Sequence, residues 1–174
     1  KVELYKIASF EINHIPLLEE VGKTKKPVII STGMADSQEI AEAVHSARIN
    51  GCKELSLLKC TSTYPATPEN TNILTIPHLR ELFECEVGLS DHTMGVGVSV
   101  ASVALGATII EKHFTLNRAD GGVDSTFSME PSEMTQLVKE TDSAWQALGQ
   151  VSYGQTSAEK KSLQYRRSLY VVED

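Results

Sequence analysis

The chain has 174 residues, of which 41% are hydrophobic and 22% are charged, and its formal net charge is −7. This acidic balance argues against nucleic acid or an anionic membrane as the main partner, because phosphate contacts need a basic face. The three cysteines show no C-x-x-C spacing, which argues against a disulfide scaffold or a zinc ribbon and favours a reducing, cytoplasmic compartment.

Five short apolar runs have the length of buried strands, at residues 5–9, 27–32, 55–61, 85–90 and 108–114. Helical patterns lie between them. Pro16 stands early in the first helical pattern, and a capping box of Asp36 and Glu39 predicts a second helix over 37–49. Pro77 is expected to open a third helix over 78–83, and Pro131 a fourth that runs through 148.

The longest uncharged stretch, residues 93–110, is only about the minimum length of a membrane span. It is rich in glycine and serine, so we interpret it as a small-residue helix that runs into a buried strand. No signal-peptide pattern follows Lys1. We therefore expect no membrane partner.

The alternation of strands and helices predicts an α/β fold with a parallel sheet. Polar residues follow the strands, as at the catalytic rim of a (β/α)8 TIM barrel. Five units cannot close eight strands, so residues 1–150 are interpreted as about strands 4–8 of such a barrel. An open doubly wound sheet is the alternative, although no G-x-G-x-x-G motif supports it.

The pattern changes after residue 150. Residues 151–161 are polar and are interpreted as a linker, and the apolar run at 169–172 could be the first strand of a further domain. The sequence therefore predicts that 151–174 joins the barrel to the truncated start of a second domain.

His92 and His113 each end one of two successive predicted strands. Neighbouring strands lie about 4.8 Å apart, so both imidazoles could bind one catalytic metal and leave positions open for water and substrate. Alternatively, both are satisfied interior histidines. Strand alternation turns Asp91 and Lys112 toward the helices, whereas Glu111 shares a side with His113.

One cation and several hydroxyls surround the same predicted rim. Lys6 with Ser9, Ser31, Ser62 and Ser90 could hold a phosphate or a carboxylate. Hydroxyls are also common in βα turns, and Lys6 could instead be a surface lysine or the Schiff-base lysine of an aldolase. Glu11 could be a general acid or base, or an N-cap residue.

Five ordered motifs resemble the sialic acid synthase family, whose members condense phosphoenolpyruvate with an amino sugar to give nonulosonic acids. They are Lys-Ile-Ala-Ser-Phe-Glu at 6–11, Pro-Val-Ile-Ile-Ser-Thr-Gly-Met at 27–34, Lys-Cys-Thr-Ser-Thr-Tyr-Pro at 59–65, Gly-Leu-Ser-Asp-His-Thr at 88–93 and Glu-Lys-His-Phe at 111–114. The resemblance implies a (β/α)8 barrel followed by a small antifreeze-like domain.

The resemblance also implies roles for individual residues. His92 and His113 would bind a divalent metal, usually Mn²⁺ and sometimes Mg²⁺ or Co²⁺. Glu11 would take part in proton transfer or stabilise a cationic intermediate, and phosphate would leave by C–O cleavage. Substrate-binding positions are Lys6, Ser9, Ser31 and Ser90 for phosphoenolpyruvate, Ser62 where the sialic branch has an asparagine, and Glu11, Tyr64 and Asp124 on the sugar side.

Within the family, the run Asp-Gly-Gly-Val-Asp-Ser-Thr-Phe-Ser-Met at 120–129 most resembles pseudaminic acid synthases. This branch implies 2,4-diacetamido-2,4,6-trideoxy-L-altrose as the sugar; N-acetylneuraminate or legionaminate synthesis is the alternative. The family also implies a homodimer when full length, and residues outside this chain that complete the site. A non-catalytic sugar- or phosphate-binding module is the hypothesis from another class.

Overall fold

The computed structural model describes residues 2–166 and 173. Its strands form one parallel sheet in the order β1-β2-β3-β4-β5, so each strand pairs with the next along the chain. The open doubly wound alternative is therefore wrong, because that fold reverses its strand order at a switch point. The strands are β1 (Tyr5–Ile7), β2 (Val28–Ser31), β3 (Leu55–Cys60), β4 (Glu86–Asp91) and β5 (Ile110–Lys112).

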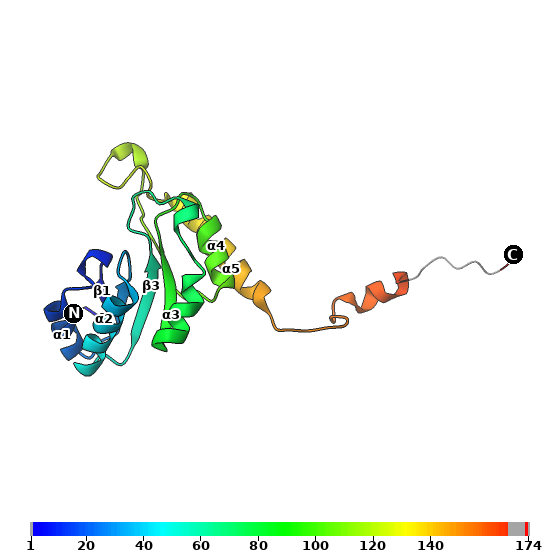
Figure 1. The fold of residues 1–174 in the computed structure, drawn as a ribbon. Helices are drawn as coiled ribbons and strands as arrows, with labels where there is room; N and C mark the ends of the chain where they lie inside the picture. The colour runs from blue at the N-terminus through cyan, green and yellow to red at the C-terminus, as the bar shows by residue number, and fades with distance from the viewer. Residues whose placement is uncertain (1, 167–172, 174) are drawn as a thin grey trace.

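The main helices alternate with these strands (Figure 1) and cover one side of the sheet. They are α1 (Ile15–Lys23), α2 (Ser37–Ile49), α3 (Thr75–Phe83), α4 (Gly97–Ala104) and α5 (Pro131–Leu148), joined by short 3-10 turns η1 (Ser9–Glu11), η2 (Pro68–Asn70) and η3 (Arg118–Asp120). The predicted bounds of α2 and α5 are confirmed.

Local chemistry explains where the helices begin. Asp36 Oδ1 accepts hydrogen bonds from the backbone amides of Gln38 and Glu39, and Glu39 Oε2 accepts one from Asp36 N–H. This capping box satisfies amides that have no partner inside the helix. α3 begins at Thr75, before the predicted start, since the first turn tolerates Pro77 without losing an intrahelical bond.

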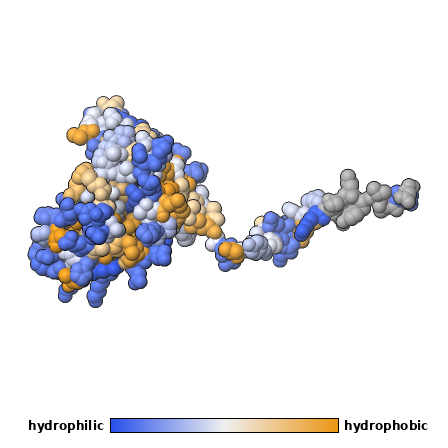
Figure 2. All heavy atoms as spheres, viewed as in Figure 1, coloured by the Kyte–Doolittle hydropathy of each residue, from blue (hydrophilic) through white to orange (hydrophobic). Residues whose placement is uncertain are grey.

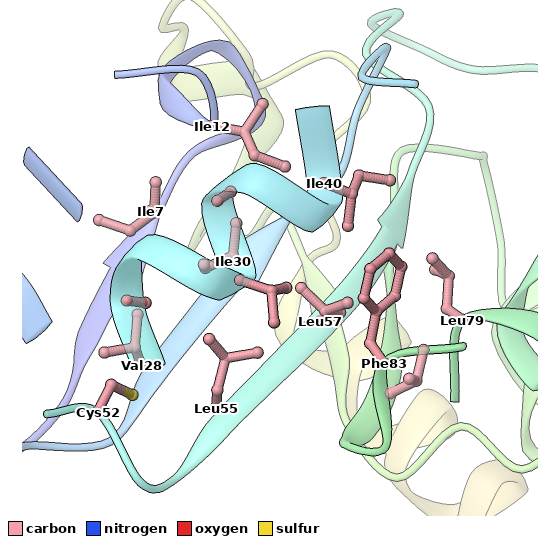
Figure 3. Packing of buried hydrophobic residues seen from close by; sticks show 14 of the residues in the cluster. Ile7, Ile12, Val28, Ile30, Ile40, Cys52, Leu55, Leu57, Leu79 and Phe83 are labelled. Atoms are coloured by element: carbon pink, nitrogen blue, oxygen red, sulfur yellow. The ribbon is translucent and has the colours of Figure 1, made fainter. Parts of the chain in front are cut away.

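The core lies between the sheet and the helices, where Ile7, Ile30 and Leu57 belong to one buried cluster with residues of α1, α2 and α3 (Figure 3). Ile7 and Ile30 are register partners, as are Ile30 and Leu57. Successive strand residues point to opposite sides, so Lys6 and Ser31 lie on the other face. The apolar positions thus decide which polar residues face away from the helices.

The predicted strands at 5–9 and 108–114 are too long. Ser9 already belongs to η1, and β5 ends at Lys112, after which Phe114 makes only an isolated bridge with Met129. The chain therefore leaves the sheet at the positions that carry the rim side chains.

Residues 150–166 extend away from the barrel elements and include the exposed turn η4 (Glu159–Tyr165) (Figure 1). The predicted strand at 169–172 lies outside the described residues. The uncharged stretch at 93–110 forms α4 and the start of β5, and no described helix could cross a membrane. Hydrophilic residues cover much of the face shown in Figure 2.

Candidate functional site

A cavity of about 250 Å³ opens at the carboxyl ends of the strands. Its walls come from all five strands or the loops that follow them, so the parallel sheet brings together residues far apart in the chain. The predicted site residues that line it are Lys6, Ser9, Ser31, Tyr64, Ser90, His92 and His113.

The two histidines lie side by side at this rim, with ring centroids 5.1 Å apart and planes at 71°. His92 Nδ1 lies 2.8 Å from the carbonyl oxygen of Thr61. A carbonyl can only accept, so Nδ1 carries a proton, and in the neutral ring Nε2 keeps its lone pair. This hydrogen bond from Nδ1 to the Thr61 carbonyl fixes the tautomer of the neutral ring and its orientation, as is usual for metal-binding histidines.

Two aromatic rings hold the imidazoles in place. Tyr64 packs 4.4 Å from the ring of His92 and 5.7 Å from that of His113. Phe127, which is 8% exposed, lies 5.0 Å from His113 on the side toward the long β5–α5 connection. Phe127 was not predicted, since nothing in its sequence neighbourhood distinguishes it from a core residue.

The two imidazoles differ in basicity. Burial lowers the pKa of His113, and the neighbouring charge of His92 lowers it further. Burial acts in the same direction on His92, but hydrogen bonds to Cys60 and to the Thr61 carbonyl outweigh it and raise the pKa of His92. His113 is therefore the ring that stays neutral more readily.

Lys6 is the cation of the cavity. Its Nζ donates to Ser31 Oγ at 2.8 Å and lies 3.5 Å from Glu111 Oε2, while Glu111 Oε1 accepts from Ser90 Oγ at 2.7 Å. Glu111 thus joins β1 to β4 and β5 across the cavity. Its place beside His113 was expected, but its link to Lys6 was not, because the two residues meet only when the sheet curls.

The hydroxyls of Ser9 and Ser62 are 2.8 Å apart, so Ser62 reaches the cavity wall through Ser9. Gly33, with φ +52°, allows this approach: a Cβ there would lie 2.4 Å from Ser9 Cβ. A side chain at position 33 would push the two hydroxyls apart.

Cys60 was not predicted as a site residue, although it lines the cavity at the end of β3. Burial raises its pKa, but hydrogen bonds from His92, Ser62 and Ser90 outweigh burial and lower it. Cys60 is only 1% exposed.

Besides Ser62, two predicted residues, Glu11 and Asp124, do not line the cavity. Glu11 is exposed, and its Oε2 accepts from Ala8 N–H at 3.0 Å. Glu11 is therefore the third residue of η1, whose N-cap is Ala8, and it is not itself an N-cap residue. Asp124 lies outside the wall but places Oδ2 3.5 Å from His113 Nδ1, where it can orient that ring.

Two side chains of the rim, His92 and His113, are of a type that binds divalent cations. Among residues 2–166 and 173 no group of three or more histidine, cysteine or carboxylate ligands is found. In their neutral forms the two imidazoles could supply two ligands and would leave the remaining positions to water and substrate, which suits a catalytic ion.

Comparison with known families matches residues 1–153 to the NeuB family. The chain belongs to the NeuB family. It is 42% identical over 173 residues to a pseudaminic acid synthase of Campylobacter jejuni, covering 98% of this chain and 50% of that protein. It is 39% identical to an N,N'-diacetyllegionaminic acid synthase of the same species, covering 99% of this chain and 53% of that protein.

The chain spans about half the length of these curated NeuB relatives. Among solved structures, an N-acetylneuraminic acid synthetase from Leptospira borgpetersenii, in complex with citrate, superposes with a TM-score of 0.85 at 38% identity, covering 97% of this chain and 59% of that one. A 3-deoxy-D-arabino-heptulosonate 7-phosphate synthase from Thermotoga maritima, at 20% identity and a TM-score of 0.74, shares the fold alone. The prediction of a (β/α)8 barrel fold is confirmed.

Proposed function

We propose that this chain carries the donor-binding part of a nonulosonic acid synthase, an enzyme that condenses phosphoenolpyruvate with an open-chain amino sugar. The observation that carries the proposal is the cavity, which sets a lysine and serine hydroxyls beside two histidines. Relatives of similar identity are named for pseudaminic, legionaminic and neuraminic acid synthesis, which supports the reaction class.

The donor would occupy the side of the cavity that holds Lys6. Lys6 Nζ and the hydroxyls of Ser9, Ser31 and Ser90 are donors for the phosphate and carboxylate oxygens, with Ser62 supporting Ser9. Charge-assisted bonds of this kind orient the donor so that its C3 faces the acceptor. Glu111 now takes the bonds from Lys6 and Ser90 that an incoming anion would share.

His92 and His113 would hold the cation, for which we propose Mn²⁺, with Mg²⁺ or Co²⁺ as substitutes. When bound, the ion would supply a Lewis acid for the sugar aldehyde. Tyr64 and Phe127 fix the imidazoles from two sides, and Asp124 can orient His113 or bind a sugar hydroxyl or amide.

Glu11 is proposed for proton transfer, which requires its side chain to leave the Ala8 amide. Glu111 lines the cavity already and is a second carboxylate within reach of donor and histidines. A Schiff-base aldolase is the less favoured alternative, because the Lys6 ammonium is held between a carboxylate and a hydroxyl, as in an anion-binding site.

For the acceptor we propose the 6-deoxy amino sugar of the pseudaminic branch, on the strength of the run at 120–129. In the complete protein, which we expect to be a cytoplasmic homodimer, phosphate release should require both phosphoenolpyruvate and this sugar. A panel of 6-deoxy and 6-hydroxy amino sugars separates the branches, and a donor labelled with ¹⁸O at the bridging position should yield labelled phosphate. Phosphate release without any sugar would contradict the proposal.

A further inference from the structure

Asp91 and Lys112 form an ion pair on the helix-facing side of the sheet, as strand alternation predicted. Lys112 Nζ lies 3.1 Å from Asp91 Oδ2, and the two side chains are 3% and 0% exposed. The neighbouring residues on that face of β4, Val87 and Leu89, are apolar and buried. The pair is therefore a charged cluster inside an apolar layer.

The pair is tied to both sides of His92. Asp91 Oδ1 accepts from Thr93 N–H at 2.9 Å and from Thr93 Oγ at 2.7 Å, while Oδ2 accepts from Ser99 Oγ of α4 at 2.6 Å. Lys112 Nζ also donates to the Thr93 carbonyl. The residues before and after His92 are thus held by one network.

The pair also lies at a particular place in the sheet, directly before the two histidines. Asp91 and Lys112 are the last register partners of β4 and β5, and each is followed directly by one of the two histidines. The backbone ladder between these strands stops at this rung. At this rung the side chains of Asp91 and Lys112 join the two strand ends as well, and Lys112 Nζ also reaches the Thr93 carbonyl.

We propose that Asp91 and Lys112 are positioning residues that set the separation of His92 and His113, and through it the affinity for a divalent cation. The inference rests on the metal site of the proposed function. Taking two charges out of water is costly, and apolar residues of similar size often stabilise a fold as well or better. A packing role alone would not require charge here, whereas a bond of defined length and direction holds two strand ends at a fixed distance.

The test removes the bond but keeps the volume. In the complete protein, the double variant Asp91→Asn with Lys112→Met retains acceptors for Thr93 and leaves no unpaired charge. We expect Mn²⁺, titrated alone, to bind about 10- to 100-fold more weakly, the usual cost of losing a second-shell partner. We also expect the EPR lines of the bound ion to broaden, since the two imidazoles would no longer keep one separation.

Leu18→Ala on α1 is the matched control, because Leu18 is fully buried and lies in the core away from both histidines. It should lower the midpoint of thermal unfolding without changing Mn²⁺ affinity. If the double variant fails to fold, Ser99→Ala decides in its place, with a smaller loss of affinity expected. Unchanged affinity and unchanged EPR lines in a folded variant would overturn the positioning role.

Failure of the proposed function has a different outcome. If the wild-type protein and His92→Ala bind Mn²⁺ equally, the metal is not held by the histidines, and both the metal site and the positioning role are wrong. If His92→Ala abolishes binding and the pair variant does not weaken it, only the positioning role is wrong.

Discussion

The two faces of the sheet are built from the same strands, but one face forms the apolar core and the other forms the polar cavity. On the helix side, Ile30 and Leu57 are fully buried and pack among helices. On the opposite side, Lys6 donates to Ser31 and forms an ion pair with Glu111 at the wall of a cavity. Because neighbours along a strand point to opposite faces, the apolar core and the cavity are built from alternate residues and should be separable by mutation. The Asp91–Lys112 pair, on the helix side, is the proposed connection between them.

The strongest way to separate the faces is His92→Ala. We expect turnover of the complete enzyme to fall more than about 100-fold, since the loss of a second-shell partner alone costs about 10- to 100-fold. Thermal unfolding should change little, because His92 contributes no packing to the helix layer. His45→Ala, on the exposed side of α2, is the control and should keep full activity. Near-normal metal content and turnover in His92→Ala would remove the metal assignment.

On the helix face, Leu57→Ala should have the opposite profile. The side chain is fully buried, so we expect a loss of about 2–5 kcal/mol in the free energy of unfolding from the removed contacts and the remaining cavity. Chemical denaturation measures this loss. Folded Leu57→Ala protein should retain Mn²⁺ affinity, and a large loss of affinity without a loss of stability would break the comparison between the faces.

Lys6→Ala tests the cavity face at the proposed donor site. Removing one charge-assisted contact should raise the KM for phosphoenolpyruvate about 10- to 100-fold, corresponding to about 1.5–3 kcal/mol. Steady-state kinetics measures the change, and Lys53→Ala on an exposed loop is the matched control. Should borohydride with pyruvate trap a covalent adduct at Lys6, the Schiff-base alternative would replace this one.

The smallest effect concerns pH. The pKa of His92 is raised above its ordinary value of about 6.5, while that of His113 is lowered. Mn²⁺ binds only neutral imidazoles. Its affinity should therefore fall as the pH drops through the pKa of His92, and binding near about pH 6.5 should release a proton from that ring. NMR titration of the metal-free protein would contradict this if His113 kept its proton to a higher pH than His92.

Much of the fold follows from local patterns. The capping box that begins at Asp36 specifies α2, and Pro131 at a helix start specifies α5. The apolar runs locate the strands. Strand order then brings His92 and His113 together, because both follow neighbouring parallel strands. The helix starts and the strands can be recognised within single segments, and the meeting of the histidines follows from the order of neighbouring strands.

Other parts of the site depend on contacts between distant segments. The bond between Lys6 and Glu111 crosses the cavity, and Phe127 reaches His113 only through the course of the β5–α5 connection. The direction of the Glu11 carboxylate depends on a competing amide at Ala8. Side-chain direction at such positions follows from packing and turn geometry, which periodicity does not encode.

The most direct test of the central claim is pulsed EPR of Mn²⁺ bound to the complete protein. The account predicts nitrogen couplings from two imidazoles, of which one disappears in His92→Ala and the other in His113→Ala, with a change in the spectrum when phosphoenolpyruvate is added. Bound Mn²⁺ that shows no imidazole coupling, or a spectrum that neither substitution alters, would contradict it.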